Sequence, residues 1–318
     1  MNGIATLSLP FFGIIFIGYA FGRIKTMPGD ALGWFNVFII YVALPALFFQ
    51  LISRTPFEQL TNWPYIATTT GATFAMFMLS LGVGLLLKAA LPEATMQGVL
   101  GSYSNVGYMG PGLTLAVFGP SAAVPTALIF SFDCTLFFVT VPVLMAIAGR
   151  GAQGPWQTAS LIARRVLLHP FILATIAGVV AAYFAYVPPA PIVRTLDTLM
   201  GAAAPSALFV LGVTVAQRPV RRVPLELPAL LAFKLLVHPV VVFLLLSLVG
   251  DFDPVWVQVA LLMAALPPAL NVFVLAQQYD AYVERASAGV LIGTVCSVLT
   301  VTAFLYLITE GLLPGDPF

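Results

Sequence analysis

Two stretches of this chain are GVLGSYSNVGYMGPGLTLAVFG at residues 98–119 and VQVALLMAALPPALNVFVLAQQ at residues 257–278. Both are apolar, and both contain helix-breaking residues near their middles: glycines and Pro111 in the first, Pro267 and Pro268 in the second. Proline removes a backbone hydrogen-bond donor, and its ring clashes with the preceding helical turn. We therefore expect two helices that break within a larger apolar structure.

The composition places these helices in a membrane. The chain has 318 residues, of which 60% are hydrophobic and 8% charged, whereas about 25% are charged in an ordinary soluble domain. The formal net charge of +1 excludes nucleic-acid binding through bulk charge. The two cysteines, Cys134 and Cys296, are too few for a disulfide framework or a zinc site, so we expect no cofactor.

Ten apolar segments approach the roughly 20 residues that a membrane-spanning helix requires. They are roughly 4–22, 32–52, 65–87, 95–118, 122–148, 166–187, 195–217, 225–249, 254–278 and 285–309. The expected fold class is therefore an all-α integral membrane protein with ten transmembrane helices.

The ten segments form two similar halves. Prolines 10, 28, 45 and 64 recur at 170, 188, 205 and 224, with one offset of 160 residues. Pro45 lies in ALPALFF and Pro205 in AAPSALF, so the flanking sequences also agree. Five segments separate equivalent positions, so the second half must be inverted in the membrane, as in alternating-access transporters. This predicts a first repeat at 1–148, a cytoplasmic linker at 149–165 and a second, inverted repeat at 166–318.

The cations of the connecting loops predict the orientation. Alternate loops carry ten lysines and arginines, whereas the opposite loops carry two, Arg54 and Arg194. Because cytoplasmic loops are enriched in cations, this bias predicts a multi-pass protein of the plasma (inner) membrane with both termini outside the cytoplasm.

The two broken segments are each the fourth of their repeat, so they run in opposite directions and their breaks are expected to cross near the midplane. A new half-helix begins after each break, and helix N-termini carry free amide donors and a positive dipole end. An in-membrane asparagine accompanies each break, Asn105 in the first and Asn271 in the second. The pattern predicts an anion site at the crossing, although ordinary kinks remain an alternative because glycine and proline are common in membrane helices.

Three ionisable residues fall at membrane depth, where such groups are costly: Asp133, Lys234 and His238. Asp133 and His238 are each expected near the midplane, and Lys234 lies one turn from His238 on the same helix face. If Lys234 touches Asp133, a fixed structural pair is favoured. If it does not, Asp133 with His238 is the better candidate for proton coupling. Uniport driven by the membrane potential is the rival.

Other classes of protein are less well supported. The HExxH and GxSxG patterns are absent from the sequence, and Asp133 has no second deep carboxylate, so we expect no enzyme activity. An anion channel would require rings of charge or of carbonyl groups, and it stays the alternative from a different class.

The stretches SNVGYMGPGL and LPPALNVFVLAQQYDA resemble the auxin efflux carrier family, which includes bacterial malonate permeases and the plant PIN-FORMED carriers. The resemblance covers nearly the whole chain. It implies a scaffold, dimer-forming domain of helices 1, 2, 6 and 7, and a transport domain of helices 3–5 and 8–10 with crossed broken helices 4 and 9. The long cytoplasmic loop of the plant members is missing, which favours a bacterial carrier of a small organic anion such as malonate over one of an auxin-like acid.

We therefore expect a homodimeric secondary transporter, surrounded by membrane lipid, that binds a mono- or dicarboxylate at the crossing. The similar architecture of the bile acid/sodium symporters leaves sodium coupling open beside proton coupling. The expected substrate-binding residues are Asn105, Tyr108, Gly110, Pro111, Pro268 and Asn271, with Pro45 and Pro205 closing the site from the scaffold side.

Overall fold

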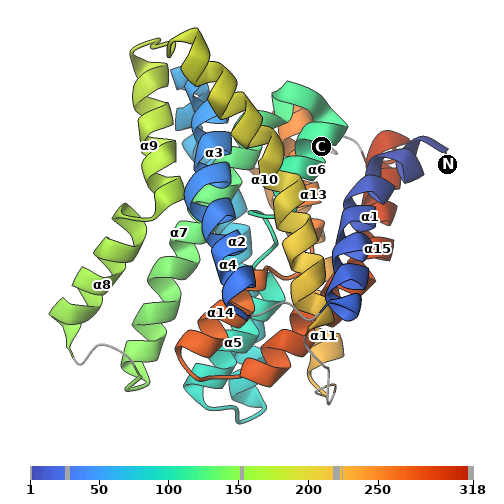
Figure 1. Cartoon of the computed structure of the whole chain (residues 1–318). Coiled ribbons are helices and arrows are strands. Elements are labelled where there is room, and N and C mark those ends of the chain that lie inside the picture. Colours follow the sequence, from blue (N-terminus) through green and yellow to red (C-terminus); the bar gives the residue numbers. More distant parts are fainter. Residues whose placement is uncertain (1, 26–28, 151–153, 218–222, 224, 314–318) are drawn as a thin grey trace. The chain divides into compact units, whose positions relative to one another are not determined.

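The computed structural model describes residues 2–25, 29–150, 154–217, 223 and 225–313. Within these ranges every regular element is a helix, apart from one isolated β-bridge (Figure 1). This confirms the all-helical class expected from the composition. The chain forms two compact units, and each of them takes segments from both halves of the sequence.

Six helical stretches in the described residues are long and apolar enough to cross a membrane. They are Ala31–Ser53, Trp63–Leu86, Gly110–Ile147, Ala190–Ala216, Leu227–Val249 and Val283–Thr309. Three shorter apolar helices accompany them: Pro10–Ile24, Pro170–Tyr183 and Pro254–Ala265. The chain is therefore a multi-pass membrane protein, whereas the ten-span inverted repeat stays a prediction.

The first unit comprises Met1–Asn62, Gly107–Ser131 and Leu167–Pro219. It contains α1 (Asn2–Ile24), α2 (Gly29–Phe38), α3 (Leu44–Ser53), α6 (Gly110–Phe118), the start of α7 (Ala123–Ile147), α9 (Pro170–Tyr183) and α10 (Ala190–Ala216). A π-helical segment, Ile39–Ala43, joins α2 to α3, and 3₁₀ turns occupy Phe57–Thr61 and Gly119–Ala122.

Small residues and stacked aromatic rings hold this unit together. Helices α1 and α10 lie side by side, and a methyl group at Gly212 would overlap the backbone carbonyl of Ile15. Helix α3 packs along α9 (Figure 1). There the ring of Phe130 stacks on Phe48 at 4.3 Å between centroids and meets Phe171 edge-on at 4.4 Å.

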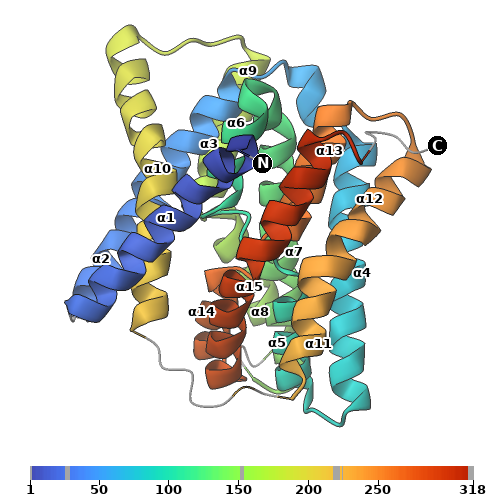
Figure 2. The same ribbon diagram turned by 90° about the vertical axis from the view of Figure 1, so that its right-hand side faces the viewer.

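The second unit comprises Trp63–Val106, Phe132–Val166 and Val220–Phe318. It contains α4 (Trp63–Leu86), α5 (Leu91–Ser102), the rest of α7, most of α8 (Pro155–Leu167), α11 (Leu227–Ala232), α12 (His238–Val249), α13 (Pro254–Ala265), α14 (Leu270–Gln278) and α15 (Val283–Thr309). The π-helical segment Phe233–Val237 joins α11 to α12. Helix α12 lies beside α4 (Figure 2).

Two predicted segments differ in detail from the structure. The segment 149–165 stays a predicted linker; it contains most of helix α8, which begins at Pro155, and its residues 151–153 lie outside the described residues. The segment predicted to start at 195 starts earlier. Helix α10 instead begins at Ala190, so Asp197 lies two turns inside it and cannot serve its N-terminus.

Candidate functional site

The first break separates α5, which ends at Ser102, from α6, which begins at Gly110. Residues 103–109 between them are not helical. Pro111 lies in the first turn of α6, where its missing N–H is not required. The helical segment is therefore interrupted at the glycine and proline residues where the sequence predicts a break.

The second break separates α13, which ends at Ala265, from α14, which begins at Leu270. Pro267 and Pro268 occupy the gap, and the residue before them, Leu266, has the extended conformation that a following proline favours. All residues of this gap are buried.

The two breaks pair with each other inside the second unit. Ser104 and Pro268 form an antiparallel β-bridge. The backbone N–H of Asn105 donates to the Pro267 carbonyl at 2.8 Å, and the N–H of Ala269 donates to the Tyr103 carbonyl at 2.9 Å. Non-helical backbone is tolerated at membrane depth only where protein or water satisfies its polar groups. Each break therefore supplies hydrogen bonds that the other has lost.

Polar side chains surround this pairing. Asn105 is fully buried, and Asn271, in the first turn of α14, is half-buried. The Asn271 amide hydrogen-bonds to the hydroxyl group of Tyr103, which also lies 3.0 Å from the sulfur of Cys134. The predicted residues Asn105, Pro268 and Asn271 thus lie around one short antiparallel pairing.

The remaining predicted binding residues belong to the first unit. Tyr108 precedes α6 and donates a 3.4 Å hydrogen bond to the side-chain oxygen of Asn36, and Gly110 and Pro111 begin α6. Pro45 is half-buried in the first turn of α3, directly after a π-helical segment, whereas Pro205 is exposed within continuous α10. The two prolines therefore differ in local structure.

The ionisable residues at membrane depth form one buried cluster in the second unit. The Thr73 hydroxyl lies 3.3 Å from Asp133 Oδ2, to which it donates, and 3.3 Å from His238 Nε2. Lys234 Nζ lies 3.3 Å from His238 Nδ1 and donates to the carbonyl of Ala264 at 2.5 Å. All four side chains are at most 3% exposed. Asp133 and Lys234 have no direct hydrogen bond in the described contacts, so Thr73 and His238 connect them.

Lys234 also links this cluster to the second break. Ala264 lies in the last turn of α13, where backbone carbonyls have no N–H donor within the helix. The ammonium group therefore caps the end of the half-helix with positive charge, as the dipole favours. The hydroxyl of Ser104, in the first break, approaches the same carbonyl at 3.5 Å.

A π-helical turn positions the lysine and the histidine. The backbone N–H of His238 bonds to the carbonyl of Phe233, five residues earlier, and Pro239 follows in the first turn of α12. Such single π turns inside helices are frequent at functional sites. The sequence showed Lys234 and His238 but gave no sign of Thr73, because a threonine in an apolar helix is common, or of a backbone carbonyl as partner.

A second polar cluster lies where α11 and α15 begin. Glu226 Oε1 accepts hydrogen bonds from Tyr282 at 2.7 Å and from Arg285 at 3.0 Å. Burial raises the pKa of Glu226, but these two hydrogen bonds and the Arg285 charge outweigh it, so the pKa lies below its ordinary value. The Glu226 carboxylate precedes α11 but makes no capping bond there, and it instead joins two helices.

The described residues contain no group of three histidine, cysteine, aspartate or glutamate side chains placed to hold a metal ion.

Comparison with known proteins identifies the family. Residues 4–305 match the family model described as "Membrane transport protein". The chain is 53% identical over 319 residues to the "Putative malonate transporter" of Rhizobium meliloti (strain 1021), with 100% of both chains covered. It is 22% identical to the "Uncharacterized transporter YfdV" of Escherichia coli (strain K12), covering 94% of this chain and 95% of that one. An "Uncharacterized transporter" of Methanothermobacter thermautotrophicus is 25% identical, covering 90% and 92%.

The family match spans both breaks and nearly the whole chain, and these relatives are named as transporters, which agrees with the resemblance drawn from the two broken segments. The chain is a membrane transporter and belongs to the membrane transport protein family, the auxin efflux carrier family of its resemblance.

Proposed function

We propose that this protein is a secondary transporter that moves a small organic anion, a mono- or dicarboxylate such as malonate, across the inner membrane by alternating access. The name of the 53% identical relative supports a dicarboxylate substrate, since identity at this level extends over the whole of both chains. An auxin-like acid is the less favoured substrate.

The observation that carries the proposal is the antiparallel pairing of the two breaks. In this pairing the N–H of Ala269 donates to the Tyr103 carbonyl, and α14 begins at the next residue, Leu270. The first amide groups of a helix have no partner within the helix, and they attract anions without a charged side chain. Asn271 adds a side-chain amide in the same turn, and Asn105 lies in the paired segment. A carboxylate is the ligand that such donors favour.

We propose Asn105, Pro268 and Asn271 as the part of the substrate site contributed by the second unit. Tyr108, Gly110, Pro111, Pro45 and Pro205 remain proposed contributors from the first unit. The division of the chain into two compact units supports a mechanism in which one body moves against another. In this proposal the first unit contains the scaffold helices 1, 2, 6 and 7 together with Gly107–Ser131 of predicted helices 4 and 5, and the second unit contains the rest of the transport domain.

The buried cluster supports proton coupling as part of the same proposal. Asp133 and His238 share the Thr73 hydroxyl, so a proton has a hydrogen-bonded path between a carboxylate and an imidazole. Lys234 holds the far side of the imidazole ring and the end of α13. Protonation of this cluster would change the charge beside the break where the substrate binds. Uniport and sodium-coupled transport are the rivals.

The binding site is tested by two asparagine variants. Asn105→Ala and Asn271→Ala are expected to weaken malonate binding by about 1–3 kcal/mol each, because each removes a hydrogen-bonding partner from a buried polar site. The matched control is Gln277→Ala, which removes an exposed amide from the same helix as Asn271. Isothermal titration of the purified protein measures the affinity. A panel of mono- and dicarboxylates in a thermal-shift screen identifies the tightest ligand, because binding to the native state raises the melting temperature. Unchanged affinity in both asparagine variants would place the site elsewhere.

A further inference from the structure

A cavity with polar and apolar lining residues lies inside the first unit. Its volume is about 360 Å³, and the ends of α3 and α6 and the middle of α10 form its walls. Its lining includes the polar side chains of Gln50, Arg54 and Thr55 and the apolar side chains of Leu51, Leu115 and Met200. A cavity of this kind, with an apolar wall and a few convergent donors, suits a small amphipathic ligand.

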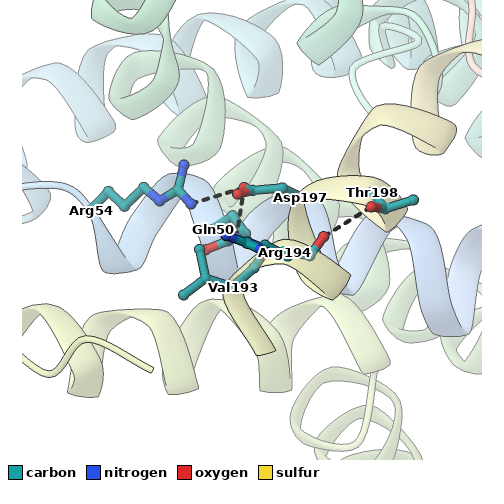
Figure 3. Close-up of polar contacts among 6 residues, drawn as sticks. All are labelled: Gln50, Arg54, Val193, Arg194, Asp197 and Thr198. Atoms are coloured by element: carbon teal, nitrogen blue, oxygen red, sulfur yellow. Dashed lines mark hydrogen bonds and ion pairs between the residues drawn. The ribbon is translucent and has the colours of Figure 1, made fainter. Parts of the chain in front are cut away.

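Two polar residues of the lining, Gln50 and Arg54, share a partner, Asp197, which does not itself line the cavity. Gln50 Nε2 donates to Asp197 Oδ1 at 2.8 Å and to the Val193 carbonyl at 3.2 Å (Figure 3). One terminal nitrogen of Arg54 donates to the same Asp197 oxygen at 2.8 Å. Gln50 is only 2% exposed, and its buried amide holds the aspartate in place.

The guanidinium group of Arg54 has unused donors. It carries five N–H groups, and its described contacts use one of its terminal nitrogens. Figure 3 shows the other terminal nitrogen pointing away from Asp197. The side chain is 52% exposed, and it lines the cavity. Arginine binds carboxylates best through two parallel hydrogen bonds, which the single bond to Asp197 does not supply.

The charge of Arg54 decides which ligand the cavity can accept. The C-terminal ends of α3 and α6 lie at the cavity, so their carbonyl dipoles disfavour an anion there. Among the lining residues, Arg54 supplies the positive charge. Without this guanidinium the cavity would be neutral to unfavourable for a carboxylate.

Helix α6 connects the cavity to the predicted substrate site. Leu115 lies four residues after Pro111 and Gly119 eight residues after it, about 6 and 12 Å along the helix at 1.5 Å per residue. The orientation predicted from the loop charges places Arg54 on the extracytoplasmic side. The cavity therefore lies where an anion would pass between that side and the start of α6.

We infer that the cavity lined by Gln50 and Arg54, whose shared partner is Asp197, is an accessory site that binds a carboxylate group of the transported anion on its way to or from the substrate site. The guanidinium group exchanges its single bond to Asp197 for a paired contact with the ligand carboxylate. Asp197 competes with the ligand and thereby keeps the site weak enough to release it. This inference rests on the proposed transport of organic anions.

The test compares variants whose effects have opposite signs. Uptake of radiolabelled malonate into proteoliposomes gives KM and the maximal rate for each variant. Arg54→Gln is expected to raise KM for malonate on the Arg54 side about threefold to tenfold, the size of one partly solvated charge-assisted contact. Asp197→Asn removes the competitor and is expected to lower KM about twofold to threefold. If Arg54 and Asp197 form only a structural pair, both variants would shift KM in the same direction or not at all.

Two controls separate this effect from general loss of charge or of folding. Arg194→Gln removes the other cation that the topology places on this side, but it lies outside the cavity lining, so its KM is expected to stay within about twofold of wild type. Arg54→Lys keeps the charge and is expected to recover part of the affinity. Wild-type protein that transports none of the carboxylates in the panel would overturn the proposed function itself. Transport by wild type with an unchanged KM in Arg54→Gln would overturn this inference alone.

Discussion

Lys234→Met tests the role of the buried cluster in the fold. The substitution keeps an apolar side chain of similar length and removes the ammonium group. The Ala264 carbonyl at the end of α13 then retains only the Ser104 hydroxyl, 3.5 Å away, and Asp133 loses its attraction to the lysine charge. An unsatisfied buried acceptor costs about 1–3 kcal/mol, and a buried carboxylate left without the compensating lysine charge raises the total loss to about 3–5 kcal/mol. We expect the free energy of unfolding to fall by about 3–5 kcal/mol.

Unfolding of the purified protein in mixed detergent micelles, followed by tryptophan fluorescence and circular dichroism, measures this loss. Lys88→Met, at an exposed lysine, is the matched control and is expected to change the free energy by about 0.5 kcal/mol or less. The double variant Asp133→Asn with Lys234→Met is expected to lose less than the sum of the single variants, because it leaves no unpaired charge. A loss below about 1 kcal/mol in Lys234→Met, or strict additivity in the double variant, would refute the reasoning.

Three further predictions concern packing, pH and coupling. Gly212→Ala is expected to destabilise the first unit by about 1–3 kcal/mol through overlap with α1, whereas Gly201→Ala in the same helix, which meets open space, is expected to be neutral or stabilising; thermal unfolding compares them. Because the folded-state pKa of Glu226 is lowered, its contribution to stability is present above its unfolded pKa and is lost as pH falls through the folded value. Glu226→Gln should therefore flatten the acid limb of a stability–pH curve, and an unchanged limb would exclude this contribution. Asp133→Asn is expected to abolish the dependence of malonate uptake on a pH gradient while substrate exchange persists; full retention of the pH dependence would leave Asp133 a structural residue.

The helix breaks could be predicted because their causes are local. Proline lacks a donor, and Pro111 with its neighbouring glycines and the adjacent Pro267 and Pro268 mark the two breaks. A single proline is not sufficient, since Pro205 lies within continuous α10. The rise per residue in a helix predicts similar depths for Asp133 and His238, and this depth stays a prediction. In the structure the Thr73 hydroxyl lies 3.3 Å from Asp133 Oδ2 and 3.3 Å from His238 Nε2.

Other parts of the site depend on contacts that leave no local sign. The carbonyl of Ala264 becomes a ligand for Lys234 only because α13 ends one residue later, and every residue carries a carbonyl. The partner of Asp197 is Gln50, 147 residues away in the chain. The start of α10 was also predicted five residues too late, so the sequence did not show that Asp197 lies two turns inside this helix.

Counterflow of malonate tests the central claim most directly. Proteoliposomes loaded with unlabelled malonate are diluted into medium with a trace of radiolabelled malonate, with the membrane potential clamped. A carrier with one alternating site exchanges substrate across the membrane, so we expect the label to accumulate transiently above its equilibrium level and the Asn105→Ala variant to reduce this overshoot. Uptake that rises only to equilibrium and is not stimulated by internal malonate would contradict the carrier account and indicate an anion channel.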